Sequence, residues 1–182
     1  GIHGATIVTS FLTPIVLSNM QDNIHGAHIP FAAEFNNMFV TIGGSGSTLG
    51  MVIFIAFFAR SAQLSALGKA SLVPAIFNIN EPILFGMPIV YNPFTAIPFF
   101  LAPMASMSLA YFAIKLQFVN PPVAQQAWPT PVGLGAFIGT AGDWRAIILA
   151  VLCALVAFII WLPFIKAYDS RLFTKEQAKT DA

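Results

Sequence analysis

Long stretches of this sequence carry no charged side chain. The chain has only 8 Lys and Arg and 7 Asp and Glu among 182 residues, and they leave four long uncharged stretches, 35–59, 82–114, 116–142 and 146–165. Charged residues make up 8% of the chain, against about 25% in an average soluble domain. A soluble domain needs a mostly polar outer shell, which so few charges cannot supply. The sequence therefore predicts an integral membrane protein.

Other classes of protein are excluded by the same composition. One Cys cannot form a disulfide within the chain, a net charge of +1 offers nucleic acid no basic face, and 57% hydrophobic residues exclude disorder. We expect no cofactor and no metal. His25, His28 and Glu34 could be written as metal ligands, but the polar, loop-like segment 19–37 gives them no fixed geometry.

The uncharged stretches predict an all-α membrane protein. A transmembrane helix needs about 20 apolar residues, and Ala146–Ile165 and Asn92–Ile114 meet this length. Phe39–Ala59 is a third predicted span, broken by the glycine-rich run 43–50. Ala5–Val16 is shorter and reads as the end of a helix that began upstream.

Two further apolar segments are too broken by Pro and Gly to span a bilayer. Leu72–Val90 contains Pro74, Pro82, Gly86 and Pro88, and Pro131–Gly142 is short and rich in Gly. Broken backbone at membrane depth is tolerated where protein or a water-filled cavity satisfies it, and it often marks a transporter's binding site. We interpret both segments as re-entrant hairpins.

The charges predict two regions and an orientation. Residues 1–165 form a membrane-embedded, substrate-binding domain, and residues 166–182 form a polar tail. The positive-inside rule places this tail and the loop with Arg60 and Lys69 in the cytoplasm, in a multi-pass protein of a cell membrane. The start, Gly1–Gly4, has neither Met nor a signal peptide, so we expect the C-terminal part of a longer protein.

Glu81 is the charged residue that the membrane explains least. It lies in the apolar run Phe77–Gly86, and a carboxylate at membrane depth costs at least about 2.5–3.5 kcal/mol, so such residues are functional by default. Pro82 suits the first turn of a helix and Asn80 suits its cap, which would direct Glu81 into a cavity. The alternative is a structural carboxylate paired with Arg60 or Lys69, or one at the membrane interface.

Other candidate residues have competing interpretations. His3 is either an ordinary helix histidine or a ligand contact. The run 43–50 lacks the Lys of a phosphate loop, so it either packs helices closely or lines a cavity. Trp128 is either an interfacial aromatic or a platform that stacks on a ligand. Trp144 and Trp161 look like interface residues.

One motif is more specific than these patterns. The run N-I-N-E-P-I-L-F-G-M-P (Asn78–Pro88) closely resembles the signature of IIC permeases of the bacterial phosphoenolpyruvate-dependent sugar phosphotransferase system, in the lactose, cellobiose and N,N'-diacetylchitobiose family. Further matching runs follow the family's order: G-I-H-G at 1–4, G-G-S-G-S-T-L-G at 43–50, W-P-T-P at 128–131 and L-P-F-I-K-A-Y-D at 162–169. The resemblance covers the C-terminal half of such a permease.

The resemblance implies a function and a set of partners. Such a permease binds a disaccharide and carries it across the bacterial cell membrane. The sugar is phosphorylated at its 6-hydroxyl by a phosphocysteine on a separate IIB protein, and a IIA protein is an indirect partner. The chain would then be the membrane subunit of a sugar phosphotransferase. Glu81 and His3 would be its catalytic pair, and His3, Asn80, Glu81 and Trp128 would bind the substrate. The N-terminal half would form a homodimer interface. An ion-coupled secondary sugar transporter is the alternative.

Overall fold

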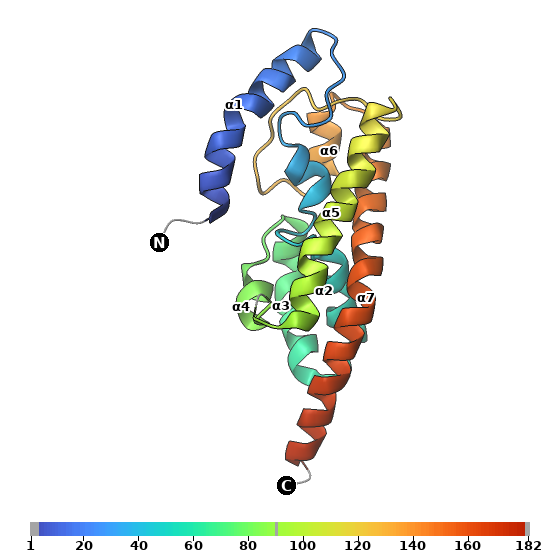
Figure 1. The fold of residues 1–182 in the computed structure, drawn as a ribbon. Helices are drawn as coiled ribbons and strands as arrows, with labels where there is room; N and C mark the ends of the chain where they lie inside the picture. The colour runs from blue at the N-terminus through green and yellow to red at the C-terminus, as the bar shows by residue number, and fades with distance from the viewer. Residues whose placement is uncertain (1–3, 90, 181–182) are drawn as a thin grey trace.

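Helices connected by loops make up the computed structural model, which describes residues 4–89 and 91–180 (Figure 1). No strand occurs in this described part. The helices in chain order are α1 Gly4–Ile24, the π-helix η1 Asn36–Val40, α2 Leu49–Phe58, α3 Ala62–Ile76, α4 Glu81–Gly86, α5 Pro93–Lys115, α6 Leu134–Gly139 and α7 Trp144–Thr180. His3 lies outside the described residues.

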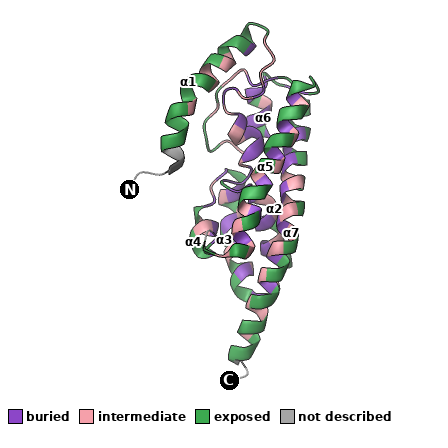
Figure 2. Cartoon of the chain, viewed as in Figure 1, coloured by how far each residue is buried: buried purple, intermediate pink, exposed green. Residues whose placement is uncertain are grey.

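Two described helices, α5 and α7, are long and apolar enough to cross a membrane. They coincide with the spans predicted at 92–114 and 146–165, which are confirmed as helices. The 23 residues of α5 measure about 35 Å and the 37 residues of α7 about 55 Å. A bilayer core is about 30 Å thick, so α7 is long enough to extend beyond it. Large apolar side chains such as Phe100, Val151 and Ile159 are exposed along both helices (Figure 2).

Small buried residues form the seam between α5 and α7, which lie side by side (Figure 1). The seam consists of Ala102, Ser106 and Ala110 on α5 and of Ala146, Ala150, Cys153 and Ala157 on α7. Ser106 Oγ donates a hydrogen bond to the Cys153 carbonyl (3.1 Å). Small residues let helix backbones approach closely, which is the main source of helix association inside a bilayer.

The segment predicted to be a hairpin at 72–90 contains two helices joined by a turn. Its first arm, α3, begins ten residues earlier than expected, at Ala62, and its second arm, α4, begins at Glu81. α3 packs on α2, and α2 packs in turn on α7. Gly68 permits the contact between α2 and α3, because a Cβ there would lie 2.5 Å from the Ala56 nitrogen.

The predicted span at 39–59 is not one helix. η1 ends at Val40 and α2 begins at Leu49, so the glycine run breaks it as expected. The 10 residues of α2 are about 15 Å long, too short to cross a bilayer. The stretch 39–59 is therefore a short π-helix, a loop and a short α-helix, and neither helix is long enough to be the third span.

The N-terminal helix α1 is longer than predicted and stands away from the bundle (Figure 1). It continues to Ile24, although the polar composition predicted loop from residue 19 onward. Its end is tied to the bundle by Asn23, whose side-chain amide donates to the Ile29 and Pro122 carbonyls, both at 2.9 Å. Phe11 and Ile15 on α1 are exposed.

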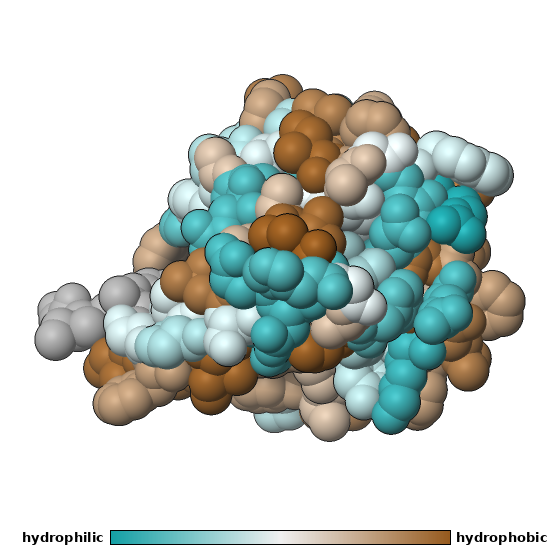
Figure 3. All heavy atoms as spheres, turned by 90° about the horizontal axis from the view of Figure 1, so that it is seen from above, coloured by the Kyte–Doolittle hydropathy of each residue, from teal (hydrophilic) through white to brown (hydrophobic). Residues whose placement is uncertain are grey.

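The loops at residues 25–35 and 116–133 and the start of α7 form the upper end of the molecule. Hydrophilic and hydrophobic patches alternate when this end is viewed from above (Figure 3). The segment 131–142 forms the single short helix α6 rather than a hairpin of two helical arms.

Asp143 fastens the start of α7 at this end. Its carboxylate accepts from the Asn120 N–H (2.9 Å) and from Arg145 Nε (2.9 Å). Burial alone would raise the pKa of Asp143, but the hydrogen bonds from Arg145 and Asn120 outweigh it and hold the pKa below its ordinary value.

Candidate functional site

The glycine-rich loop, defined here as residues 41–48, lies between η1 and α2. Gly43, Gly44 and Gly46 have φ values of +78°, +94° and +84°, and Ser47 has a φ of +53°. Such backbone is open to Gly and strained for other residues. The Thr48 hydroxyl donates to the Gly43 carbonyl (2.6 Å) and closes the loop on itself.

Two asparagines from the turn between α3 and α4 hold this loop. Asn78 Oδ1 accepts from the Gly43 N–H (2.8 Å), and Asn80 Nδ2 donates to the Ser45 carbonyl (2.6 Å). A Cβ on Gly44 would overlap the Asn80 side chain. Glycine is therefore needed at position 44 because the Asn80 side chain lies directly against the loop backbone. Here the structure favours close packing over a cavity wall.

The third contact to the loop comes from α7. Trp161 Nε1 donates to the Gly46 carbonyl (2.9 Å), and the Trp161 side chain is fully buried. The interpretation of Trp161 as a membrane-interface residue was wrong. Its spacing contained the necessary signal, since Trp161 follows the small residues Ala150 and Ala157 on the buried stripe of α7.

The first turn of α4 begins directly after Asn80, the second asparagine that binds the glycine-rich loop. Pro82 lies in that turn, as predicted, and the Asn80 carbonyl accepts from the Leu84 N–H (2.9 Å). The Asn80 side chain makes no capping bond. Asn80 is thus the N-cap residue of α4, as expected, but its side chain does not cap the helix because its amide is bound to the glycine-rich loop instead.

Glu81 is the first residue of α4 and its side chain is exposed in this chain. In the described part of the molecule no ion pair joins it to Arg60 or Lys69. The structural alternative of a paired carboxylate is therefore not seen. The expectation that Glu81 lies enclosed in a cavity is also not met by this chain alone, because its side chain is exposed.

Trp128 is half-exposed, at 49%, in the loop between α5 and α6. Farther along the same loop, the Val132 N–H donates to the Ile76 carbonyl (3.1 Å) at the end of α3. This bond ties the loop that carries Trp128 to the turn that precedes Glu81. The structure therefore joins the loop of Trp128 to the end of α3, but no contact is seen among the described residues between Trp128 and Asn80 or Glu81, and His3 lies outside the described residues.

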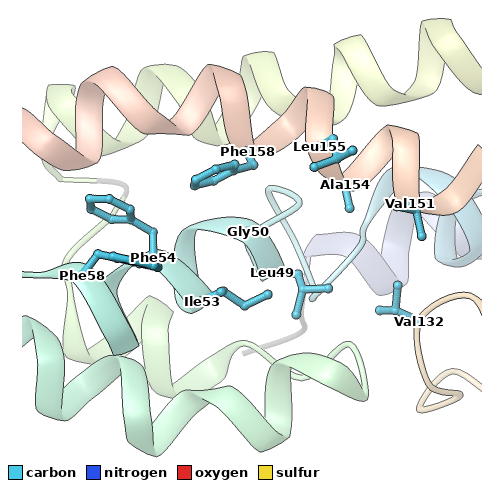
Figure 4. Close-up of a pocket in the computed structure, with 10 residues that line it drawn as sticks. All are labelled: Leu49, Gly50, Ile53, Phe54, Phe58, Val132, Val151, Ala154, Leu155 and Phe158. Carbon is cyan, nitrogen blue, oxygen red and sulfur yellow. The ribbon is translucent and has the colours of Figure 1, made fainter.

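An apolar pocket between α2 and α7 lies apart from these residues. It has a volume of about 390 Å³ and is lined by residues of α2 and α7 together with Val132, and Figure 4 shows side chains from both helices facing across it. Its side chains, including Phe54 and Phe158, are all apolar. A site that recognises a polar ligand needs a few placed polar groups, so this pocket does not qualify.

Asn78 and Trp161 are the residues of this region that sequence reasoning missed. Both act on the loop through single hydrogen bonds. Asn78 has a left-handed φ of +60°, a conformation that Asn tolerates better than most residues. An Asn two residues before a second Asn, in a segment rich in Pro, was the only available signal.

Comparison with known proteins gives one consistent answer. The family model for the phosphotransferase system EIIC matches residues 1–103. The chain is 36% identical to the lactose-specific EIICB component of Lacticaseibacillus casei, over 100% of this chain and 32% of that protein. It is 36% identical to the lichenan permease IIC component of Bacillus subtilis, over 97% of this chain and 40% of that protein.

A solved structure agrees with these relatives. It is that of the transporter ChbC, the IIC component from the N,N'-diacetylchitobiose-specific phosphotransferase system, with 41% identity and a TM-score of 0.91. The match covers 97% of this chain and 43% of ChbC, so the chain spans less than half of the relatives it matches. The chain belongs to the EIIC family, the membrane permeases of the phosphotransferase system.

Proposed function

We propose that this chain is the C-terminal, substrate-binding half of a permease that takes up a disaccharide of the cellobiose, N,N'-diacetylchitobiose or lactose type. The sugar is phosphorylated at its 6-hydroxyl by phosphorylated IIB during uptake. Support comes from relatives named for lactose, lichenan and cellobiose and from the structure named for N,N'-diacetylchitobiose.

The observation that supports the chemistry is the position of Glu81. Its carboxylate is exposed on the first turn of α4, while the backbone just before it is held by Asn78 and Asn80. An unpaired carboxylate on a rigid turn can accept a proton from a hydroxyl group that is placed against it. Phosphoryl transfer otherwise depends mainly on positioning and charge stabilisation.

The proposed step balances as follows. The 6-hydroxyl oxygen of the sugar attacks the phosphorus of phosphocysteine on IIB, and the O–P bond forms as the S–P bond breaks. Glu81 takes the hydroxyl proton, and the cysteine leaves as a thiolate. The sugar 6-phosphate is released to the cytoplasm.

The remaining site residues have more limited proposed roles. Trp128 stacks on one face of the sugar, since its ring is exposed on a loop tied to α3. His3 contacts the sugar. Asn80 shapes the site through its amide NH2, which donates to the Ser45 carbonyl (2.6 Å) and faces the Thr48 hydroxyl (3.4 Å), so the amide is committed to the glycine-rich loop.

The proposed topology follows the charges. The protein is multi-pass, residues 1–165 lie in the membrane with 72–90 as a re-entrant hairpin, and residues 166–182 lie in the cytoplasm, where IIB and IIA act. The segment that the relatives have in addition to this chain would cover Glu81 and form a homodimer.

The test is a transport assay on a permease that contains this chain together with that additional segment. Proteoliposomes are loaded with phosphoenolpyruvate and the soluble phosphotransferase proteins, with or without IIB, and supplied with labelled cellobiose, N,N'-diacetylchitobiose or lactose. We expect sugar 6-phosphate inside only when IIB is present. Accumulation of unmodified sugar under an ion gradient without IIB would instead identify an ion-coupled transporter.

A further inference from the structure

The last four turns of α7, residues 166–180, are polar, yet they continue the helix, and the part up to Glu176 contacts the bundle. Tyr168 and Leu172 lie against the apolar core around α2. The Arg171 guanidinium lies over the Phe94 ring at the start of α5, 3.8 Å from its centroid. This segment, which we call the α7 extension, is therefore part of the packed structure, although its composition is that of a solvated tail.

Two carboxylates of the α7 extension bind the start of α3. Asp169 is 4% exposed and accepts from the Arg60 N–H (3.0 Å) and the Ser61 N–H (3.0 Å). Glu176, two turns farther along, accepts from the Ser61 hydroxyl (2.7 Å) and the Ala62 N–H (3.0 Å). These N–H groups belong to the first turn of α3 or directly precede it, and have no partner within the helix.

The opposite end of α3 is also connected to α7, through the glycine-rich loop. Asn78 and Asn80, just after α3, bind the loop, and Trp161 on α7 binds the same loop. The rise from Trp161 to Glu176 is about 22 Å and the rise from Ala62 to Ile76 is about 21 Å. Trp161 and Glu176 are thus about as far apart along α7 as the two ends of α3 are from each other. Between those ends, α3 packs on α2.

We infer that Asp169 and Glu176 are positioning residues for Glu81. They bind the start of α3 to α7, while Trp161 binds the glycine-rich loop that holds the turn after α3, and together these contacts restrain α3 and the turn that carries Glu81. The carboxylates act from the proposed cytoplasmic end on a residue at the far end of a 15-residue helix. This inference rests on the proposed function, because it states that the contacts of Asp169 and Glu176 with the start of α3 affect the rate of phosphoryl transfer.

The experiment compares Asp169→Asn and Glu176→Gln in the complete permease. Three quantities are measured for each variant: kcat for sugar phosphorylation by phosphorylated IIB, the sugar Kd and the melting temperature. We expect kcat to fall by up to about a hundredfold, the effect of a displacement of about 1 Å at a reacting group, while the sugar Kd changes little. Glu176 is half-buried near a helix end, so Glu176→Gln is expected to fold even if Asp169→Asn does not.

The matched control is Asp143→Asn. Asp143 also binds backbone N–H groups at an end of α7, but at the opposite end of the helix from α3. It should lower the melting temperature and leave kcat nearly unchanged. If the control lowers kcat as much as the Asp169 and Glu176 variants do, or if those variants keep normal kcat, the inference is overturned. If the unmodified permease makes no sugar 6-phosphate, the proposed function itself fails.

Discussion

At the scale of single residues, the neighbours Asn80 and Glu81 differ in their surroundings: the Asn80 amide binds the glycine-rich loop, and the Glu81 side chain is exposed. Glu81 stood out because a carboxylate in an apolar run needs a reason, and the structure leaves it unpaired among the described residues. The partner of Asn80 was not predictable, because the glycine-rich loop that it binds lies 35 residues away in the chain. The burial of Trp161 could have been read from its helical spacing.

Gly44→Ala tests the contact between Asn80 and the loop. The new Cβ would overlap the Asn80 side chain at a residue with a φ of +94°, so we expect a loss of about 2 kcal/mol or more of stability and a fall in phosphorylation. The measurement is the melting temperature and kcat of the complete permease.

Gly26→Ala is the matched control for that variant. Gly26 has a similar φ of +99°, but a Cβ there would have no atom within 4 Å. Gly26→Ala introduces the backbone strain without the steric overlap, so its loss of stability should be clearly smaller than that of Gly44→Ala. Equal losses in the two variants would show that backbone strain alone explains the effect and that contact with Asn80 does not.

At the scale of elements, hydrophobic length predicted the two long helices, and the glycine run 43–50 predicted a break between η1 and α2. Polar composition was wrongly taken for loop at residues 19–24, which continue α1. Residues 166–180, predicted as part of a polar tail, continue α7 as helix. In both cases the polar side chains make tertiary contacts, by Asn23 to Pro122 and by Asp169 to the start of α3, and such contacts depend on which distant segments meet.

Ala150→Leu tests the seam between α5 and α7. Ala150 is fully buried in a cluster that also contains Ala110, so a larger side chain should separate the helices at a loss of about 1–3 kcal/mol. The neighbouring Val151 is 50% exposed, and Val151→Leu should change little. Melting temperatures of the two variants in detergent provide the comparison, and equal values would contradict the assigned helix faces.

At the scale of the whole molecule, the distribution of charge carries the account. Fourteen charged residues lie outside the predicted spans or at their borders. Two of them, Asp169 and Glu176 at the proposed cytoplasmic end, bind the backbone around the start of α3. Class and family followed from sequence alone. The sequence also predicted an enclosed Glu81, whereas this chain, which spans less than half of its relatives, leaves the Glu81 side chain exposed.

The most direct test of the account is Glu81→Gln in the complete permease, with the sugar Kd and the single-turnover rate of sugar 6-phosphate formation from phosphorylated IIB both measured. Gln keeps the size of the side chain and loses its ability to take a proton. The account predicts that sugar binding persists while the rate falls by about 10²–10⁴-fold, the usual contribution of a general base. A variant that phosphorylates sugar at the normal rate would contradict the central claim.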